Sequence, residues 1–197
     1  MIRIVGFIGN IKVGKTTAAK YLVEQGYVRL RFAQALKDML EFGLNIPNEY
    51  IDGSKKNEPC EQLCWRTTRH AMMTLGTEWG RNMIHPDIWV KALERELFLE
   101  IEQGGYNFVI DDFRFLSEVE WLRNLKLVSQ WPLELQNKWP IEQCIIRIIR
   151  GSEKIIEHQS EIEQGSIKSD WAIFNNDSVE SMYKSIDEVL EFIFKKE

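Results

Sequence analysis

The sequence predicts an α/β fold in which a mainly parallel sheet is flanked by helices. Two features support this prediction. Short apolar runs alternate along the chain with amphipathic segments, which is typical of parallel strands joined by crossover helices. A glycine-rich stretch, GNIKVGKT at residues 9–16, directly follows the first apolar run and precedes a helix-forming segment. The chain lacks internal repeats and low-complexity tails, so we expect a single domain over residues 1–197.

Five apolar runs have the length and composition of short buried strands. The first, MIRIVGFIG, is almost wholly apolar, and the second, YVRLRFA, alternates between apolar and polar residues. A tryptophan- and proline-rich patch at 128–140 fits neither period, and we expect it to be a strand that ends in an irregular connection. The expected strands are residues 1–9, 27–33, 107–112, 144–149 and 171–176.

Helices are expected between these strands. Gly26 ends the first helix, and Pro86 precedes a long amphipathic helix that Gly104 and Gly105 close. Residues 61–84 look largely helical, with interruptions around Gly76 and Gly80, whereas 43–60 is expected to be a loop. With these two included, the expected helices outside 61–84 are residues 15–25, 34–42, 88–103, 116–125 and 178–195. The charged stretch 151–169 separates the last two strands.

Composition excludes several classes of protein. A net charge of −5 argues against a general nucleic-acid coat protein, while leaving room for a local basic pocket. No run approaches the roughly 20 apolar residues of a membrane span. The three cysteines lack C-x-x-C spacing, which favours a reducing compartment and no metal cage. We therefore expect a cytoplasmic protein with no stable nucleic-acid or membrane binding.

The stretch GNIKVGKT matches G-x-x-x-x-G-K-[ST], the phosphate-binding loop, and its place between a strand and a helix supports the match. Glycines allow backbone N–H groups to point at phosphate oxygens, a lysine reaches the β- and γ-phosphates, and a hydroxyl coordinates Mg²⁺. The alternative is a plain glycine-rich turn before a helix. We expect ATP and Mg²⁺ as cofactors, with the nucleotide bound by Gly9, Asn10, Lys12, Val13, Gly14, Lys15, Thr16 and Thr17.

Two adjacent acids, Asp111 and Asp112, end the run NFVI. A carboxylate at the carboxyl end of a parallel strand beside the phosphate loop can hold Mg²⁺, directly or through water. Adjacent strand residues point to opposite faces, so the two acids are not expected to share one task, and one of them could instead cap the next helix. We assign Thr16 and Asp111 to the metal and Asp112 to catalysis and substrate binding.

The chain has no N-K-x-D sequence of a switch GTPase, and its 197 residues suit a small-molecule kinase better than a motor. The run RHAMMTLGTEWGR at 69–81, followed by DIWV at 87–90, resembles the signature of the bacteriophage deoxynucleoside monophosphate kinases. Further segments are similar to that family in the same order: Arg31-Phe32-Ala33 with Leu36-Lys37, DFRF at 112–115 with Glu118, Arg147 with Arg150, HQSE at 158–161, and Asn176-Asp177.

This resemblance covers nearly the whole chain and implies a P-loop NTPase fold of the nucleoside monophosphate kinase type. It implies transfer of the γ-phosphate of ATP to a deoxynucleoside 5′-monophosphate, with an acceptor-binding helical region at about 34–104 and a lid at about 150–169. Lys15, Arg147, Arg150 and Asp112 would be catalytic, and Asn176 would contact adenine. The implied acceptor-binding residues are Phe32, Lys37, Arg69, Glu78, Trp79, Arg81, Asp112 and Arg114.

Plainer interpretations stand beside these assignments. The arginines could form surface ion pairs, Phe32 and Trp79 could be core residues, and His158 and Ser160 could lie in an exposed turn instead of organising the lid. The family usually has glutamine where this chain has Met73, which leaves the acceptor base open. Another small-acceptor kinase, such as a dephospho-coenzyme A kinase, or a nucleotide-binding protein without transfer activity, are the rival functions. The resemblance also allows a homodimer.

Overall fold

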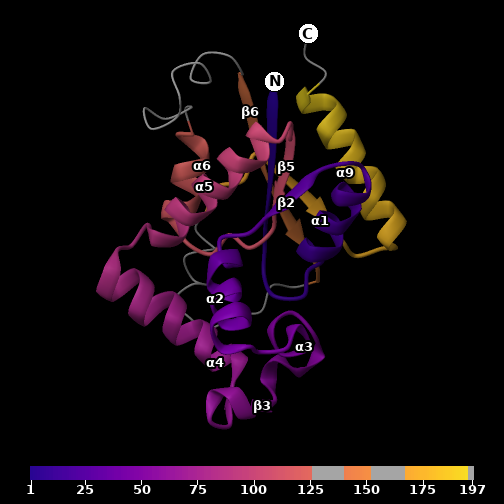
Figure 1. Cartoon of the computed structure of the whole chain (residues 1–197). Coiled ribbons are helices and arrows are strands. Elements are labelled where there is room, and N and C mark those ends of the chain that lie inside the picture. The colour runs from indigo at the N-terminus through magenta and orange to yellow at the C-terminus, as the bar shows by residue number, and fades with distance from the viewer. Residues whose placement is uncertain (126–139, 152–166, 195–197) are drawn as a thin grey trace. The chain divides into compact units, whose positions relative to one another are not determined.

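The computed structural model describes residues 1–125, 140–151 and 167–194 (Figure 1). The chain divides into two compact units: the first comprises Met1–Arg31 and Leu97–Glu197, and the second comprises Phe32–Glu96. The predicted strand and connection at 128–140, and most of the predicted lid with His158 and Ser160, lie outside the described residues. The single-domain organisation remains a prediction.

A five-stranded sheet forms the centre of the first unit. All its strand pairs are parallel, and the strand order is β2-β5-β1-β6-β7. The central strand β1 is buried along most of its length, because neighbours pair with both its edges and helices cover the sheet. The predicted mainly parallel α/β fold is therefore confirmed. The strands are β1 (Ile2–Ile8), β2 (Val28–Leu30), β5 (Asn107–Ile110), β6 (Ile141–Ile149) and β7 (Trp171–Phe174).

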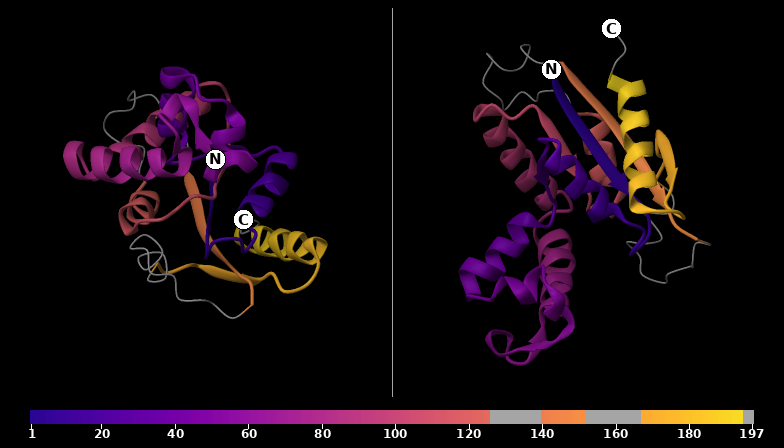
Figure 2. Two further views of the ribbon diagram at one scale, coloured as in Figure 1. Left: turned by 90° about the horizontal axis from the view of Figure 1, so that it is seen from below. Right: turned by 90° about the vertical axis from the view of Figure 1, so that its right-hand side faces the viewer.

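Helices cover both faces of this sheet. On one face, α1 (Lys15–Glu24) and α9 (Val179–Phe194) pack side by side, and α6 (Leu116–Arg123) lies on the other face (Figure 2). The small residues Ala18 and Ala19 bring α1 close to the sheet, where both are fully buried. Tyr21 of α1 stacks on Tyr183 of α9 with ring centroids 4.0 Å apart, which joins the two helices.

The carboxyl ends of all five strands lie at one edge of the sheet, because every pair is parallel. The loop that follows β1 therefore emerges between the ends of β5 and β6. This central position is where open parallel sheets bind ligands, since the crossover connections on either side of it diverge.

The second unit is mainly helical and has its own apolar core, formed by buried side chains such as Leu36, Leu40, Ile51 and Trp89. A two-stranded antiparallel sheet lies between its short helical turns. Its elements are α2 (Gln34–Leu44), α3 (Asn48–Ile51), η1 (Ser54–Asn57), β3 (Pro59–Cys60), η2 (Glu61–Leu63), β4 (Arg66–Thr67), α4 (Thr68–Met73), η3 (Thr74–Ile84) and the start of α5 (Ile88–Glu102).

Two expectations for this unit were wrong. Residues 43–60 are not one loop, because they contain the short helices α3 and η1 and the strand β3. Helical structure also does not break at Gly76 or Gly80, since α4 continues into η3, an eleven-residue π-helix. Trp89 contacts both glycines: its indole N–H donates to the carbonyl of Gly76 at 2.7 Å, and a Cβ at Gly80 would lie 2.6 Å from its ring.

Candidate nucleotide-binding site

The loop after β1 has the backbone that a phosphate-binding loop requires. Gly9 and Gly14 adopt φ angles of 137° and 112°, which side chains disfavour. Space is also lacking at both positions: a Cβ would lie 2.3 Å from the carbonyl oxygen of Ile148 at Gly9, and 2.6 Å from Nδ2 of Asn175 at Gly14. Both glycines are therefore required by conformation and by close packing.

The bulky residues inside the loop point in different directions. Ile11 and Lys12 are exposed, and Lys12 has a positive φ of 65°. Val13 is buried and joins the apolar cluster beneath α1 and α9. Val13 therefore fixes the loop to the apolar core through its buried side chain.

Polar groups at the end of the loop gather at the start of α1. The Lys15 Nζ donates to the carbonyl oxygens of Gly9 and Asn10, the latter at 2.7 Å, so its ammonium lies over the loop. The first turn of α1 contains no acidic residue. The first N–H groups of a helix have no partner within the helix, and its N-terminus carries a partial positive charge, so this turn suits an anion such as phosphate.

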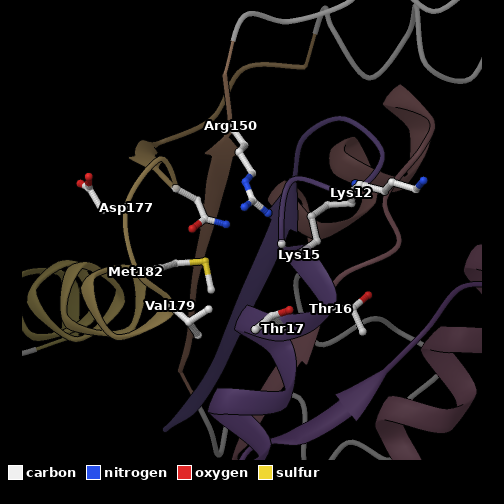
Figure 3. A pocket seen from close by; sticks show the side chains of 10 residues that line it. Lys12, Lys15, Thr16, Thr17, Arg150, Asp177, Val179 and Met182 are labelled. Carbon is white, nitrogen blue, oxygen red and sulfur yellow. The ribbon is translucent and has the colours of Figure 1, made fainter.

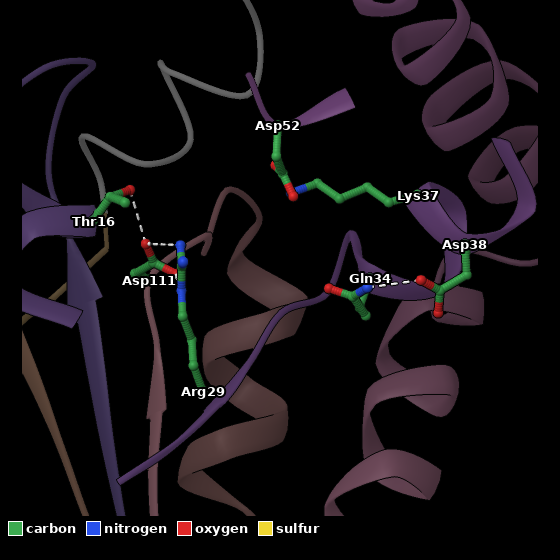
Figure 4. A network of polar contacts seen from close by, with 7 residues as sticks. All are labelled: Thr16, Arg29, Gln34, Lys37, Asp38, Asp52 and Asp111. Carbon is green, nitrogen blue, oxygen red and sulfur yellow. Dashed lines mark hydrogen bonds and ion pairs between the residues drawn. The ribbon is translucent and has the colours of Figure 1, made fainter. Parts of the chain in front are cut away.

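Thr16 and Asp111 are brought together although they are far apart in sequence. The Thr16 hydroxyl donates to Oδ2 of Asp111 at 2.9 Å. Asp111 also accepts two hydrogen bonds from Arg29 of β2, from Nε at 2.9 Å and from Nη2 at 2.7 Å (Figure 4). Asp111 is buried. Sequence reasoning missed Arg29, because its strand showed only a plain alternation of apolar and polar residues.

A cavity of about 280 Å³ extends from the loop toward the ends of β6 and β7. Figure 3 shows Arg150 extending from the end of β6 toward Lys15, while Val179 and Met182 project from the start of α9. The lining residues are Lys12, Gly14, Lys15, Thr16, Thr17, Arg150, Asn175, Asp177, Val179 and Met182. Cations at the loop and apolar atoms at α9 suit a phosphorylated ligand with a flat, weakly polar group.

Two neighbouring asparagines after β7 have different roles. Asn175 is buried and lines the cavity, and its Nδ2 donates to the carbonyl oxygen of Val13 at 2.8 Å. Asn176, the residue expected to contact adenine, is exposed and does not line the cavity; its Oδ1 accepts from the backbone N–H of Gly151 at 2.8 Å. Sequence spacing alone could not tell which asparagine faces the loop.

The remaining sites predicted in the first unit lie at the ends of β5 and β6. Arg114 is exposed, and its backbone N–H donates to the buried carboxylate of Glu118 at 2.6 Å. Glu118 thus fixes the turn that carries Arg114. Asp112 is half-buried beside it. Arg147 donates to the carbonyl of Ile167 at 2.5 Å and does not line the cavity that Arg150 lines.

Most of the predicted acceptor-binding residues belong to the second unit. Phe32 is buried, whereas Arg69 and Glu78 are exposed. Lys37 is buried and forms an ion pair with Asp52, with Nζ and Oδ1 2.5 Å apart (Figure 4). Trp79 is 37% exposed, on the π-helix η3.

Two contacts hold the part of the π-helix that carries the GTEWGR motif. Arg81 donates to the carbonyl of Pro86 at 2.8 Å, and Trp79 lies 6.3 Å from Trp89 between ring centroids. The π-helix is a rare element, and its common single-turn form is frequently found at functional sites. The motif therefore has an unusual π-helical backbone, against which the buried Trp89 packs.

Within the described ranges, no group of three or more His, Cys, Asp or Glu side chains is placed to hold a metal ion. Among the helices of the same residues, none is both long enough and apolar enough to cross a membrane.

Comparison with known proteins supports the fold and the resemblance. No protein-family model matches the chain. A protein of Acanthamoeba polyphaga mimivirus, described as "Putative deoxynucleotide monophosphate kinase", is 27% identical over 93% of each chain. Among solved structures, TT1252 from Thermus thermophilus matches with a TM-score of 0.52 and 16% identity, covering 98% of each chain. Dephospho-CoA kinase from Campylobacter jejuni matches with a TM-score of 0.52 and 15% identity, covering 99% of this chain and 98% of its own.

The mimivirus relative confirms the resemblance that the motifs indicated. The two solved structures confirm the predicted α/β fold.

Proposed function

We propose that this protein transfers the γ-phosphate of ATP to a deoxynucleoside 5′-monophosphate and so supplies a DNA precursor. The phosphate loop with its adjoining cavity is the observation that carries the proposal, because it joins a phosphate cradle to space for a nucleotide. The mimivirus relative supports the choice of a deoxynucleotide acceptor, since its similarity extends over 93% of both chains.

Phosphoryl transfer needs mainly positioning and charge neutralisation, because little covalent chemistry is left to the protein. In this proposal, Lys15 binds the β- and γ-phosphates once it exchanges the loop carbonyls of Gly9 and Asn10 for phosphate oxygens. Arg150 extends toward Lys15 across the cavity and neutralises charge on the group in transfer. Val179 and Met182 offer apolar contacts to the base.

The donor set near Thr16 fits Mg²⁺, which prefers oxygen ligands. The hydroxyl of Thr16 supplies such an oxygen beside the phosphate loop, and the carboxylate of Asp111 accepts its hydrogen. When bound, Mg²⁺ neutralises phosphate charge and polarises the transferred group.

On the acceptor side, Arg114 is proposed to bind the monophosphate, with Glu118 holding its backbone in place. Guanidinium groups suit this task because they bind phosphate bidentately. Arg69, Arg81 and Lys37 are proposed as further phosphate contacts, and Phe32, Glu78 and Trp79 as base and sugar contacts. Met73 is 46% exposed in α4, so the Met73→Gln variant tests whether this position sets base preference.

The test is ADP release with Mg-ATP against a panel of deoxy- and ribonucleoside monophosphates and dephospho-coenzyme A. We expect turnover that depends on one or two deoxynucleotides. Turnover with dephospho-coenzyme A alone would replace the proposed acceptor, and ATP binding without any turnover would replace the proposed enzyme with a binding protein.

Two variants test the roles of the cations. Lys15→Ala should lower kcat by roughly a hundredfold or more, whereas Lys20→Ala, an exposed lysine on the same helix, should leave it unchanged. Arg150→Ala should lower kcat more than it weakens ATP binding, because its charge acts on the transferring group. Equal effects on both quantities would limit Arg150 to binding.

A further inference from the structure

Arg29 has an unusual relationship to the acid expected to serve the metal. It lies on β2, which pairs in parallel with β5 so that Arg29 is level with Val109, two residues before Asp111. Its guanidinium reaches the end of β5 and holds both carboxylate oxygens of Asp111, at 2.9 and 2.7 Å. Such charge-assisted, two-point contacts between arginine and a carboxylate are among the strong hydrogen-bonded pairs in proteins.

Little of the acceptor capacity of Asp111 remains. A carboxylate offers about four lone-pair sites. Oδ1 accepts from Nε of Arg29, while Oδ2 accepts from Nη2 of Arg29 and from the hydroxyl of Thr16. The Asp111 side chain is only 2% exposed, so solvent does not weaken this contact. Its negative charge is also balanced by the guanidinium.

A divalent cation needs an accessible, negatively charged oxygen, and Asp111 does not present one. Direct coordination would require Arg29 to withdraw, and the guanidinium would repel the cation until it did so. Thr16 is different: its hydroxyl hydrogen is committed to Asp111, so the lone pairs of its oxygen remain available as a ligand.

We propose that Arg29 withholds Asp111 from direct coordination of a divalent cation in the nucleotide-free protein. Asp111 then acts as a positioning residue that orients Thr16, and Arg29 positions Asp111. The inference rests on the proposed function for the expectation that a divalent cation binds beside Thr16, but its test requires no turnover.

The test measures Mn²⁺ binding to the nucleotide-free protein by electron paramagnetic resonance, since Mn²⁺ accepts the oxygen ligands that suit Mg²⁺. Wild-type protein should bind weakly. Arg29→Gln removes the positive charge and the two-point contact with Asp111. This variant should bind Mn²⁺ roughly tenfold more tightly or better, because the freed carboxylate of Asp111 attracts the cation. Adding Asp111→Asn to Arg29→Gln should return the affinity to the wild-type level.

A matched control comes from the same sheet. Arg3→Gln makes the same chemical change at a partly exposed pair, in which Nε lies 3.4 Å from Glu142, and should leave Mn²⁺ affinity unchanged. Circular dichroism checks that each variant is folded. If Arg29→Gln does not fold, Arg29→Lys takes its place in the test, because lysine keeps the charge but cannot make the two-point contact. We expect its affinity for Mn²⁺ to be roughly threefold higher than that of wild-type protein.

The proposal is overturned if the folded Arg29 variants bind Mn²⁺ no more tightly than wild-type protein, as a purely structural ion pair predicts. It is also overturned if the gain persists in the double variant, since the cation would then use other groups. Failure of the acceptor panel together with a gain in Mn²⁺ affinity would reject the proposed reaction and leave the role of Arg29 intact.

Discussion

Asn175 connects the last strand to the phosphate loop, and replacing it tests how strongly the loop depends on this contact. Its Nδ2 donates to the carbonyl oxygen of Val13 at 2.8 Å, in a site where Asn175 is only 6% exposed. Asn175→Ala leaves that carbonyl without its partner. The cost of an unpaired buried polar group is about 1–3 kcal/mol in the free energy of unfolding.

Asn175→Asp is nearly isosteric and should cost more. It places a carboxylate oxygen where the N–H donor was, so two acceptors face each other and neither is paired; we expect a loss of about 2–5 kcal/mol near pH 8. The introduced carboxyl can donate again once it is protonated, so burial and the nearby carbonyl raise its pKa in the folded state. Between the pKa of this carboxyl in the unfolded chain and its raised pKa in the folded state, the folded protein holds a proton that the unfolded chain has lost. The stability of the variant therefore falls as pH rises between these two values.

Urea unfolding followed by circular dichroism measures both effects, at pH 5 and at pH 8. Asn176→Asp is the control, because that exposed side chain uses its oxygen to accept from Gly151 and an aspartate can do the same. It should change stability by about 0.5 kcal/mol or less. If both Asn175 variants match Asn176→Asp, the hydrogen bond to Val13 does not hold the loop.

Three further predictions concern packing and titration. Gly80→Ala should lower the free energy of unfolding in urea by about 1–3 kcal/mol, because the new methyl group would lie 2.6 Å from the Trp89 ring. Gly43→Ala, whose methyl group would have no atom within 4 Å, should be neutral or stabilising. Equal effects of the two substitutions would contradict the packing role of Gly80. A thiol reagent at pH 8 should label the exposed Cys64 first, because Cys60 and Cys144 are buried and burial raises the pKa of Cys144 to about 12; equally fast labelling of Cys144, read by mass spectrometry, would refute this. The pKa of Tyr21 is raised to about 12, mainly by its hydrogen bond to Asp187. The stabilisation that this hydrogen bond provides is therefore complete below pH 10 and is lost as pH rises toward 12. The stability difference between wild-type protein and Tyr21→Phe should shrink over that range, and a constant difference in urea unfolding would be evidence against the raised pKa.

The phosphate loop and most of the sheet could be predicted because their signals are local. Strands such as β1 are continuous apolar runs, as expected when both faces are covered, and the loop motif fixes its own backbone through Gly9 and Gly14. The π-helix could not be predicted. Its sequence has ordinary helical periodicity, and Trp89, whose indole N–H donates to the carbonyl of Gly76, lies thirteen residues later in the chain.

Arg29 shows a second limit of sequence reasoning. Its partner Asp111 lies 82 residues away, and only the pairing of β2 with β5 brings them together. In the sequence, Arg29 looks like an ordinary polar residue on the open face of a short strand. Asn175 is a similar case, since its neighbour Asn176 has the same side chain and differs only in which way the chain turns after β7.

The charge of the cavity differs in sign from the net charge of the chain. The chain has a net charge of −5, yet the cavity is lined by three cations, Lys12, Lys15 and Arg150, and by one acid, Asp177. Asp111 would add a second negative charge nearby, but Arg29 neutralises it through two hydrogen bonds. A polyphosphate therefore meets a locally positive site on an acidic protein, and removing Arg29 should weaken nucleotide binding in the absence of a divalent cation while strengthening cation binding in the absence of nucleotide.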